Sequence, residues 1–204
     1  MGEILKMNTI HDYHEFLGVK TLHPLVSVID LSEVPPVRLA RKNFGFYTVF
    51  LKDVKCGDLR YGRKMYDYQE GTLVFIAPGQ IVGDDDNGTR VQVKGWALLF
   101  HPDLLLGTSL GRKMKEYSFF SYEANEALHM SDREREIVIN CFQEIREELE
   151  QAIDKHSRSI ITANIEVFLN HCVRFYDRQF ITRKDVNKDI LTRFEDLLNG
   201  YFES

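Results

Sequence analysis

The stretch that decides the fold is residues 131–180, which read SDREREIVINCFQEIREELEQAIDKHSRSIITANIEVFLNHCVRFYDRQF. It opens with Ser131-Asp132-Arg133-Glu134, a capping box in which a hydroxyl and a carboxylate satisfy free amides at a helix N-terminus. Apolar residues then recur every three or four positions, the spacing that lines one face of a helix. We therefore predict an amphipathic helix whose buried face carries Val138, Phe142, Ile145, Leu149 and Ile153.

A second amphipathic helix follows after a short polar link. Lys155-His156-Ser157 interrupts the apolar pattern, and Ser157 can cap the next helix. Two helices joined by so short a link fold back as an antiparallel pair. The apolar face of this pair either packs on a sheet of the same chain or contacts a second copy. The second helix is marked by Ile161, Ile165, Phe168, Cys172 and Phe175, and the candidates for a dimer interface are Phe142, Ile145, Leu149, Ile161 and Phe168.

The region before the pair carries the signals of short strands. Its segments are aromatic and β-branched, as strands prefer, and turns rich in glycine separate them. Short strands at intervals of roughly ten residues indicate a β-barrel or a sandwich. The predicted strands cover residues 25–30, 44–51, 59–68, 71–79 and 91–100.

Two further helices are predicted near the ends of the sequence. Residues 12–18 form a short helix that Gly18 ends. After Phe180, residues 181–188 form a charged link, and a third amphipathic helix runs almost to Ser204. Because few residues are left to cover its apolar face, we expect the natural protein to continue. That face consists of Ile190, Phe194, Leu197, Leu198 and Tyr201.

Composition and charge narrow the class of protein. The 204 residues fit one domain, or one domain with a helical appendage. A net charge of −5 argues that this chain is not itself a nucleic-acid-binding surface. The three cysteines are too far apart for a zinc motif and suit a reducing compartment. With a polar N-terminus and no run near the roughly 18 apolar residues that span a bilayer, we expect a cytoplasmic protein without a membrane partner.

The sequence carries no motif for catalysis or for metal binding. Nucleophile elbows, phosphate-binding loops and dinucleotide fingerprints are missing, so we expect no enzyme activity and no cofactor. His11 and His14 lack further ligands nearby and are predicted to be surface residues, and Asp84-Asp85-Asp86 lacks the spacing of a calcium loop. Cys141 and Cys172 fall on helix faces and are most simply core residues.

The chemistry that is left is a possible ligand cavity inside the barrel. A small barrel lined by aromatic rings with one or two polar groups suits a small ligand. Ordinary core packing is the alternative, and alternation alone does not say which face points inward. The aromatic candidates are Phe46, Tyr47, Tyr61, Phe75, Trp96 and Phe100, and the residues predicted to bind ligand are Arg38, Tyr47, Phe75 and Trp96.

Five segments, taken in order, resemble a known family. Residues 71–80, GTLVFIAPGQ, resemble the second motif of the cupin barrel. Residues 95–105, GWALLFHPDLL, are similar to the strand and turn that close the regulatory barrel of AraC-type transcription regulators. Three later segments also resemble that family: FFSY at 119–122 before EALHMS at 126–131, DKHS at 154–157, and RFYDRQF at 174–180.

The resemblance implies an architecture for the whole chain. It implies an α+β fold, with a cupin-like β-barrel or sandwich over residues 1–125, an antiparallel helical pair for dimerisation over 126–181, and the start of a connector over 182–204. The family's small effector would bind in the barrel of a homodimer. Promoter DNA would be bound only through a C-terminal domain with two helix-turn-helix motifs, which this chain does not contain.

One departure from the related cupin enzymes bears on activity. Those enzymes hold a metal with histidines that follow the Pro-Gly turn, whereas this chain reads Gln80-Ile81-Val82-Gly83 there. Metal catalysis is therefore not expected. The alternatives to a regulator are a stand-alone small-molecule-binding or interaction module and, less favoured by the sequence, a cupin enzyme. The sequence does not identify the effector.

Overall fold

A computed structural model describes the backbone of residues 4–52, 59–61, 64–66, 71–83, 88–121 and 127–202. Side chains are described for the same ranges except 59–61, 64–66 and 182–202. Several features named in the sequence analysis lie outside these residues. They are the third cysteine, Cys56, the Asp84-Asp85-Asp86 turn, the Tyr61 side chain, residues 122–126 and the apolar face expected near the C-terminus.

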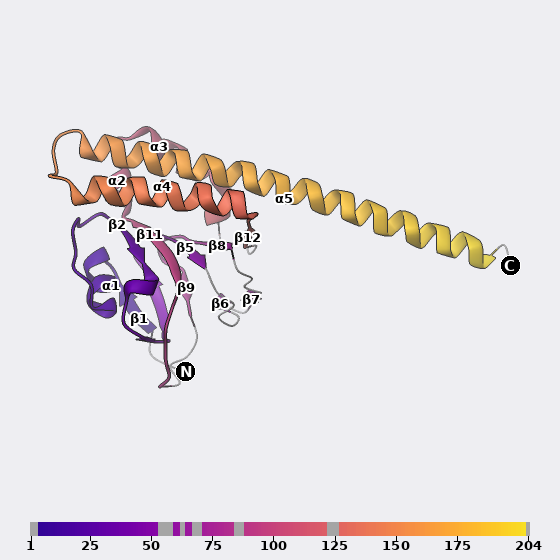
Figure 1. The fold of residues 1–204 in the computed structure, drawn as a ribbon, viewed down its shortest axis with the longest axis horizontal. Helices are drawn as coiled ribbons and strands as arrows, with labels where there is room; N and C mark the ends of the chain where they lie inside the picture. Colours follow the sequence, from indigo (N-terminus) through magenta and orange to yellow (C-terminus); the bar gives the residue numbers. More distant parts are fainter. Residues whose placement is uncertain are drawn as a thin grey trace.

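The described residues form a mixed α+β fold with two five-stranded sheets, a two-stranded ribbon and a layer of helices (Figure 1). None of these sheets closes into a barrel. The predicted fold class, α+β, is confirmed at this level.

The first sheet has all neighbours antiparallel, in the order β12-β8-β5-β11-β2. Its strands are β2 (Val26–Asp30), β5 (Tyr47–Lys52), β8 (Thr72–Ile76), β11 (Gly95–Phe100) and β12 (Leu128–His129). Four of the predicted strands, over residues 25–30, 44–51, 71–79 and 91–100, therefore have counterparts here.

The second sheet has the order β1-β4-β9-β6-β7, with β1 and β4 parallel and the other pairs antiparallel. Its strands are β1 (Ile4–Met7), β4 (Arg41–Phe44), β6 (Leu59–Tyr61), β7 (Lys64–Tyr66) and β9 (Ile81–Val82). A short antiparallel ribbon pairs β3 (Val37–Arg38) with β10 (Arg90–Val91).

Helices complete the fold. α1 (Ile10–Leu17) follows β1 and ends at Gly18, whose φ of 71° is left-handed, as predicted. α2 (Pro102–Leu105) and α3 (Ser109–Lys113) come after β11, and α4 (Asp132–Glu150) and α5 (Ser157–Phe202) form the last part of the chain. The single-turn helices are η1 (Leu31–Glu33), η2 (Met114–Glu116) and η3 (Ser118–Phe120).

The first sheet separates two hydrophobic cores, because alternate residues of a strand point to opposite faces. One face, with Val49 and Leu51 of β5, packs on α4, α5 and the segment of α2 to η3. The other face, with Val74 and Ile76 of β8, meets Phe44 of the second sheet and the residues of α1. The chain therefore has three layers: the second sheet, the first sheet, and the helices.

The predicted strand over residues 44–51 is wrong in one respect, because the chain breaks at Gly45 and passes from one sheet to the other. The Gly45 N–H donates to the Met7 carbonyl at 2.8 Å. A Cβ at this position would lie 2.7 Å from the Asn8 carbonyl oxygen, so only glycine fits without a shift. Residues 91–100 break in the same way, between β10 and β11.

The ends of α4 and α5 also refine the sequence analysis. The Ser131 capping box is present, with the Ser131 N–H donating to Glu134 Oε2 at 2.8 Å. Ile153, predicted to be buried, lies beyond the end of α4 and is 61% exposed. Asp154 caps the start of α5, since its carboxylate accepts the N–H groups of His156 and Ser157 at 2.7 and 3.0 Å.

The predicted charged link after Phe180 is wrong, because these residues belong to α5, a single helix of 46 residues from Ser157 to Phe202. Residues 181–188 contain neither glycine nor proline, so nothing in them ends a helix. A helix of this length spans roughly 70 Å. Its second half extends well beyond the sheets (Figure 1).

Candidate functional site

The predicted aromatic ligand residues lie on the face of the first sheet that the helices cover. Tyr47 stacks on Phe100, with ring centroids 5.1 Å apart. The ring centroids of Phe75 and Phe119 lie 4.4 Å apart, and Trp96 packs against the same core. These three predicted residues therefore face the helical layer and not the space between the two sheets.

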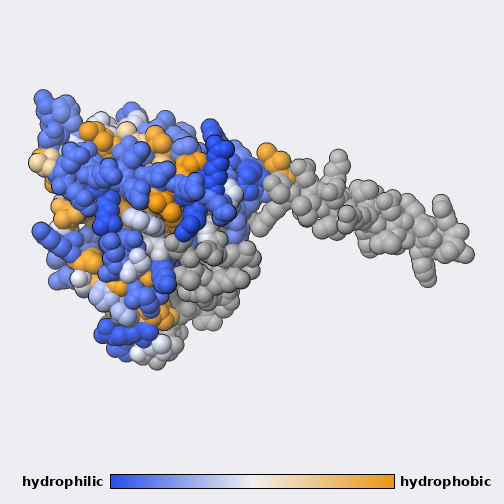
Figure 2. All heavy atoms as spheres, viewed as in Figure 1, coloured by the Kyte–Doolittle hydropathy of each residue, from blue (hydrophilic) through white to orange (hydrophobic). Residues whose placement is uncertain are grey.

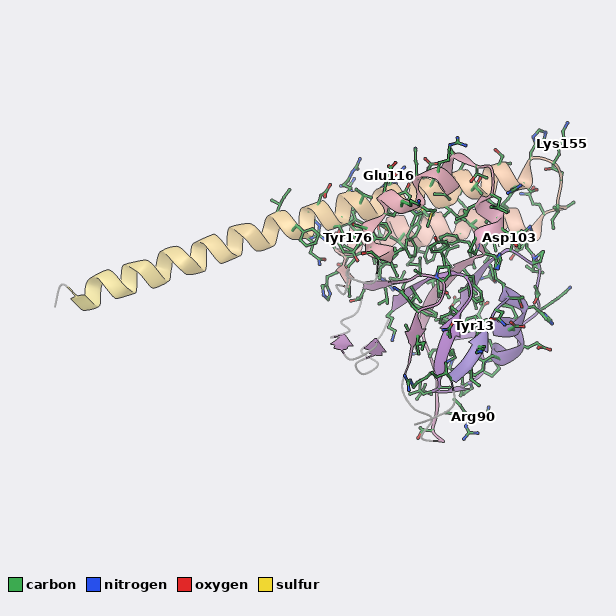
Figure 3. The ribbon with its side chains drawn as sticks, turned by 180° about the vertical axis from the view of Figure 1, so that it is seen from behind. Tyr13, Arg90, Asp103, Glu116, Lys155 and Tyr176 are labelled. Atoms are coloured by element: carbon green, nitrogen blue, oxygen red, sulfur yellow. The ribbon has the colours of Figure 1, made fainter. Side chains whose placement is uncertain are left out.

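Arg38, the fourth predicted ligand residue, lies far from the other three. It is exposed on the β3–β10 ribbon, where its Cα pairs with that of Arg90. Figure 3 shows Arg90 at the end of the molecule opposite α4 and α5, whereas Tyr176, a ring neighbour of Phe75, belongs to α5. The structure thus does not bring the four predicted residues together.

The five residues predicted to form a dimer interface are buried inside one chain. Phe142 of α4 and Phe168 of α5 are both 0% exposed, with ring centroids 5.0 Å apart. Ile145, Leu149 and Ile161 belong to the same core. They hold α4 and α5 on the first sheet, so a second copy would have to open the core to reach them.

The space between the two sheets contains a cavity of about 100 Å³, which we call the inter-sheet cavity. α1 forms one wall, and strands β4 and β5 form two others. Four aromatic side chains, Tyr13, Phe16, Phe44 and Phe50, and three lysines, Lys42, Lys52 and Lys94, are among its lining residues. Figure 3 shows Tyr13 between α1 and the strands.

Phe44 organises the aromatic part of the inter-sheet cavity. Its ring meets Tyr13 of α1 edge-on at 5.4 Å and Phe50 of the opposite sheet at 6.4 Å. Tyr13 in turn stacks on Phe16 at 6.2 Å. Edge-to-face contacts of this kind hold the rings in place, so the walls are preorganised.

Lys42 places a charge at the inter-sheet cavity. It lies two residues before Phe44 on β4, on the same face of the strand, which points toward the first sheet. Its Nζ lies 4.5 Å above the Phe16 ring and donates to the Ala40 carbonyl at 3.3 Å. Burial lowers the pKa of Lys42 to about 8, so the ammonium group is mostly charged at pH 7.

Sequence reasoning missed both Lys42 and the aromatic lining, because none of Tyr13, Phe16, Phe44 and Phe50 was among the predicted ligand residues. Lysine is rarely buried, so a pattern-based search takes it as a surface residue. Residues 41–44 read RKNF, three polar residues before Phe44, so no alternation of apolar residues marks this strand. The strand prediction therefore began at Phe44 and left Lys42 outside it.

A second cavity, of about 160 Å³, lies between the loop after α1, strand β2 and the C-terminal half of α4. His14 lies at its wall and is buried, which corrects the prediction that it is a surface histidine. Its ring nitrogens are hydrogen-bonded to Thr21 Oγ1 at 2.8 Å and Ser27 Oγ at 2.9 Å. Burial lowers the pKa of His14, so the neutral ring is favoured, and this residue ties α1 to the first sheet.

The two described cysteines are core residues, as predicted. Cys141 and Cys172 are buried between α4 and α5, and burial raises the pKa of the Cys141 thiol to about 11. A thiol of such high pKa is a poor nucleophile at neutral pH. Within the residues that the structure describes, no group of three or more His, Cys, Asp or Glu side chains is placed to hold a metal ion.

Comparison with known proteins adds no family assignment. No protein-family model matches the chain, and a search of curated proteins finds no significant match. In the described part of the structure, no helix has the length and apolar character needed to cross a bilayer.

Proposed function

We propose that this chain is the effector-binding and dimerisation part of an AraC-type transcription regulator. In this proposal the two facing sheets are a cupin-like sandwich, and the inter-sheet cavity binds a small effector. α4 and α5 form the helical pair of the dimer, and helix-turn-helix domains outside this chain bind promoter DNA. The observation that carries the proposal is the preformed aromatic cavity with a half-buried ammonium group, beside a helix that runs beyond the sheets.

The dimer contact is proposed to lie on the outer face of α5, because the inner face is already occupied by the core. Ile160, Ala163 and Val167 follow one another at steps of three and four on this face. Ile160 is 43% exposed and Val167 is 50% exposed. Figure 2 shows hydrophobic residues, in orange, among the blue hydrophilic residues of the helical layer.

A second copy of the chain is the partner that suits this face. A helix that pairs with its own copy presents the same residues to itself, so the contact closes after two chains. The exposed face of α4 is polar, with Glu136, Asn140, Gln143 and Glu147, and makes a poorer contact. A second α5 is therefore the occupant that we propose.

The N-terminal segment is the element through which an effector would act. α1 supplies Tyr13 and Phe16 to the wall of the inter-sheet cavity, and His14 on the same helix is hydrogen-bonded to Ser27 of β2. β2 in turn packs against α4. A ligand that orders α1 would thus favour one arrangement of α4 and α5, and so one geometry of the dimer.

Sedimentation of the wild-type chain and an Ile160→Asp, Val167→Asp variant tests the dimer. We expect a dimer that the two aspartates convert to a monomer with an unchanged melting temperature. Asn140→Asp with Gln143→Asp on α4 is the matched control and should leave the dimer intact. A wild-type chain that is monomeric at high micromolar concentration would refute the dimer.

Sequencing the gene beyond codon 204 tests the regulator itself. We expect on the order of 100 further residues, enough for one more domain, with two helix-turn-helix patterns and a basic surface. A stop codon after Ser204 would remove DNA binding from the proposal. The chain would then be better interpreted as a stand-alone small-molecule-binding or interaction module.

A further inference from the structure

We propose that the inter-sheet cavity binds a short-chain aliphatic monocarboxylate, with its carboxylate group on Lys42 and its hydrocarbon part among the aromatic rings. This inference names the class of effector for the function proposed above, and its biological role rests on that function. The binding itself is a property of the cavity and can be measured separately.

The charge of the described lining points to an anion. The described lining contains three lysines, Lys42, Lys52 and Lys94, and no aspartate or glutamate. The Lys42 Nζ lies 4.5 Å from the Phe16 ring centroid and donates to the Ala40 carbonyl at 3.3 Å. Neither contact neutralises its charge, so a carboxylate would offset the cost of keeping an ammonium group in a poorly solvated place.

The polarity of the rest of the lining points to a hydrocarbon. Among the described lining residues no serine, threonine, asparagine or glutamine is present, and Tyr13 is the one with an uncharged polar side chain. A sugar or another polyol would leave most of its hydroxyl groups without partners, which a site of this kind disfavours. A ligand with one charged end and an apolar remainder leaves few such groups.

The size of the cavity limits the hydrocarbon. Its volume is about 100 Å³. A water molecule takes about 30 Å³ in the liquid, and a cavity of about 150 Å³ accommodates benzene. A chain of about three to five carbons therefore fits, while longer chains must extend out through the open side or force the walls apart.

The binding should depend on pH in a stated direction. The pKa of Lys42, about 8 in the free chain, means that the ammonium group is lost as the pH rises above that value. The groups that face it are Lys52 from β5, Lys94 from the segment before β11, and Tyr13 from α1. Burial raises the pKa of Tyr13, so this residue stays neutral, and the change in affinity from pH 7 to 9.5 should follow the titration of Lys42.

Calorimetric titration with sodium butyrate, and with butyramide as its neutral counterpart, tests the inference. We expect butyrate to bind at pH 7 at least about tenfold more tightly than butyramide, the difference that a hydrogen bond to a charged group gives. Affinity should be greatest between propionate and valerate and should fall at pH 9.5. Lys42→Gln should reduce butyrate affinity about tenfold or more, and Lys155→Gln, in the exposed loop before α5, should leave it unchanged.

Each other outcome overturns the inference. Equal binding of butyrate and butyramide, binding of glucose in preference to butyrate, or no binding of any acid from acetate to octanoate would refute a carboxylate site. The wild-type pH profile keeps the test decisive if Lys42→Gln fails to fold. A chain that binds no carboxylate but dimerises through α5 would refute this inference and leave the proposed function standing. A chain that binds butyrate but stays monomeric would support this inference and refute the proposed dimer.

Discussion

Replacing Phe142 by alanine should destabilise a single chain, and not merely separate two chains. The side chain is fully buried between α4, α5 and the first sheet. Truncating a buried phenylalanine to alanine costs about 3–5 kcal/mol of unfolding free energy, because it leaves a cavity as well as losing the burial of the ring. Domains are stable by about 5–15 kcal/mol, so this is a large part of the total.

The pair formed with Phe168 makes the test more specific. Their ring centroids are 5.0 Å apart, and an aromatic pair contributes about 0.5–1.5 kcal/mol beyond burial. A double-mutant cycle with Phe142→Ala and Phe168→Ala should therefore give a coupling of about 1 kcal/mol. Phe142→Leu leaves a smaller cavity and should fall between the wild type and Phe142→Ala.

Urea unfolding at two protein concentrations, tenfold apart, distinguishes the two roles of Phe142. If Phe142 belongs to the core, its loss should lower the unfolding free energy by the same amount at both concentrations. A loss below about 1 kcal/mol, together with dissociation of a dimer, would contradict the core assignment and restore Phe142 as an interface residue.

Three further changes test other parts of the structure. Burial lowers the pKa values of His14 and His23 below the ordinary value of 6.5, so as the pH falls the unfolded chain binds protons before the folded chain does. The urea midpoint of unfolding should therefore fall as the pH drops below about 6.5. A His14→Asn variant should show a weaker fall, and a fall equal to that of the wild type would contradict the burial of His14. Asp154→Ala should lower the melting temperature more than Ser157→Ala, because Asp154 accepts two amide hydrogen bonds at the start of α5, and the reverse order would assign the cap to Ser157. Gly45→Ala should destabilise the chain by about 1–3 kcal/mol in urea unfolding, because its Cβ would meet the backbone of Asn8, and an unchanged unfolding free energy would contradict this close approach.

Local patterns in the sequence were sufficient for several elements. The capping box at Ser131 and the three- and four-residue spacing of Phe142 and Ile145 predict the start and buried face of α4, because both depend on residues within a few turns of one helix. Gly18 predicts the end of α1 in the same way, through its freedom to take a left-handed conformation. The α+β class follows from such local signals.

The tertiary structure decided what each apolar or charged side chain meets. The alternation of β5 is the same whichever face is inward, so only the packing of α4 and α5 shows that Tyr47 faces the helices and Phe50 the other sheet. The assembled sheets also place Lys42 beside Phe16, which lies 26 positions earlier in the sequence. A half-buried lysine such as Lys42 leaves no periodic signal, because its cavity exists only when α1, β4 and β5 come together.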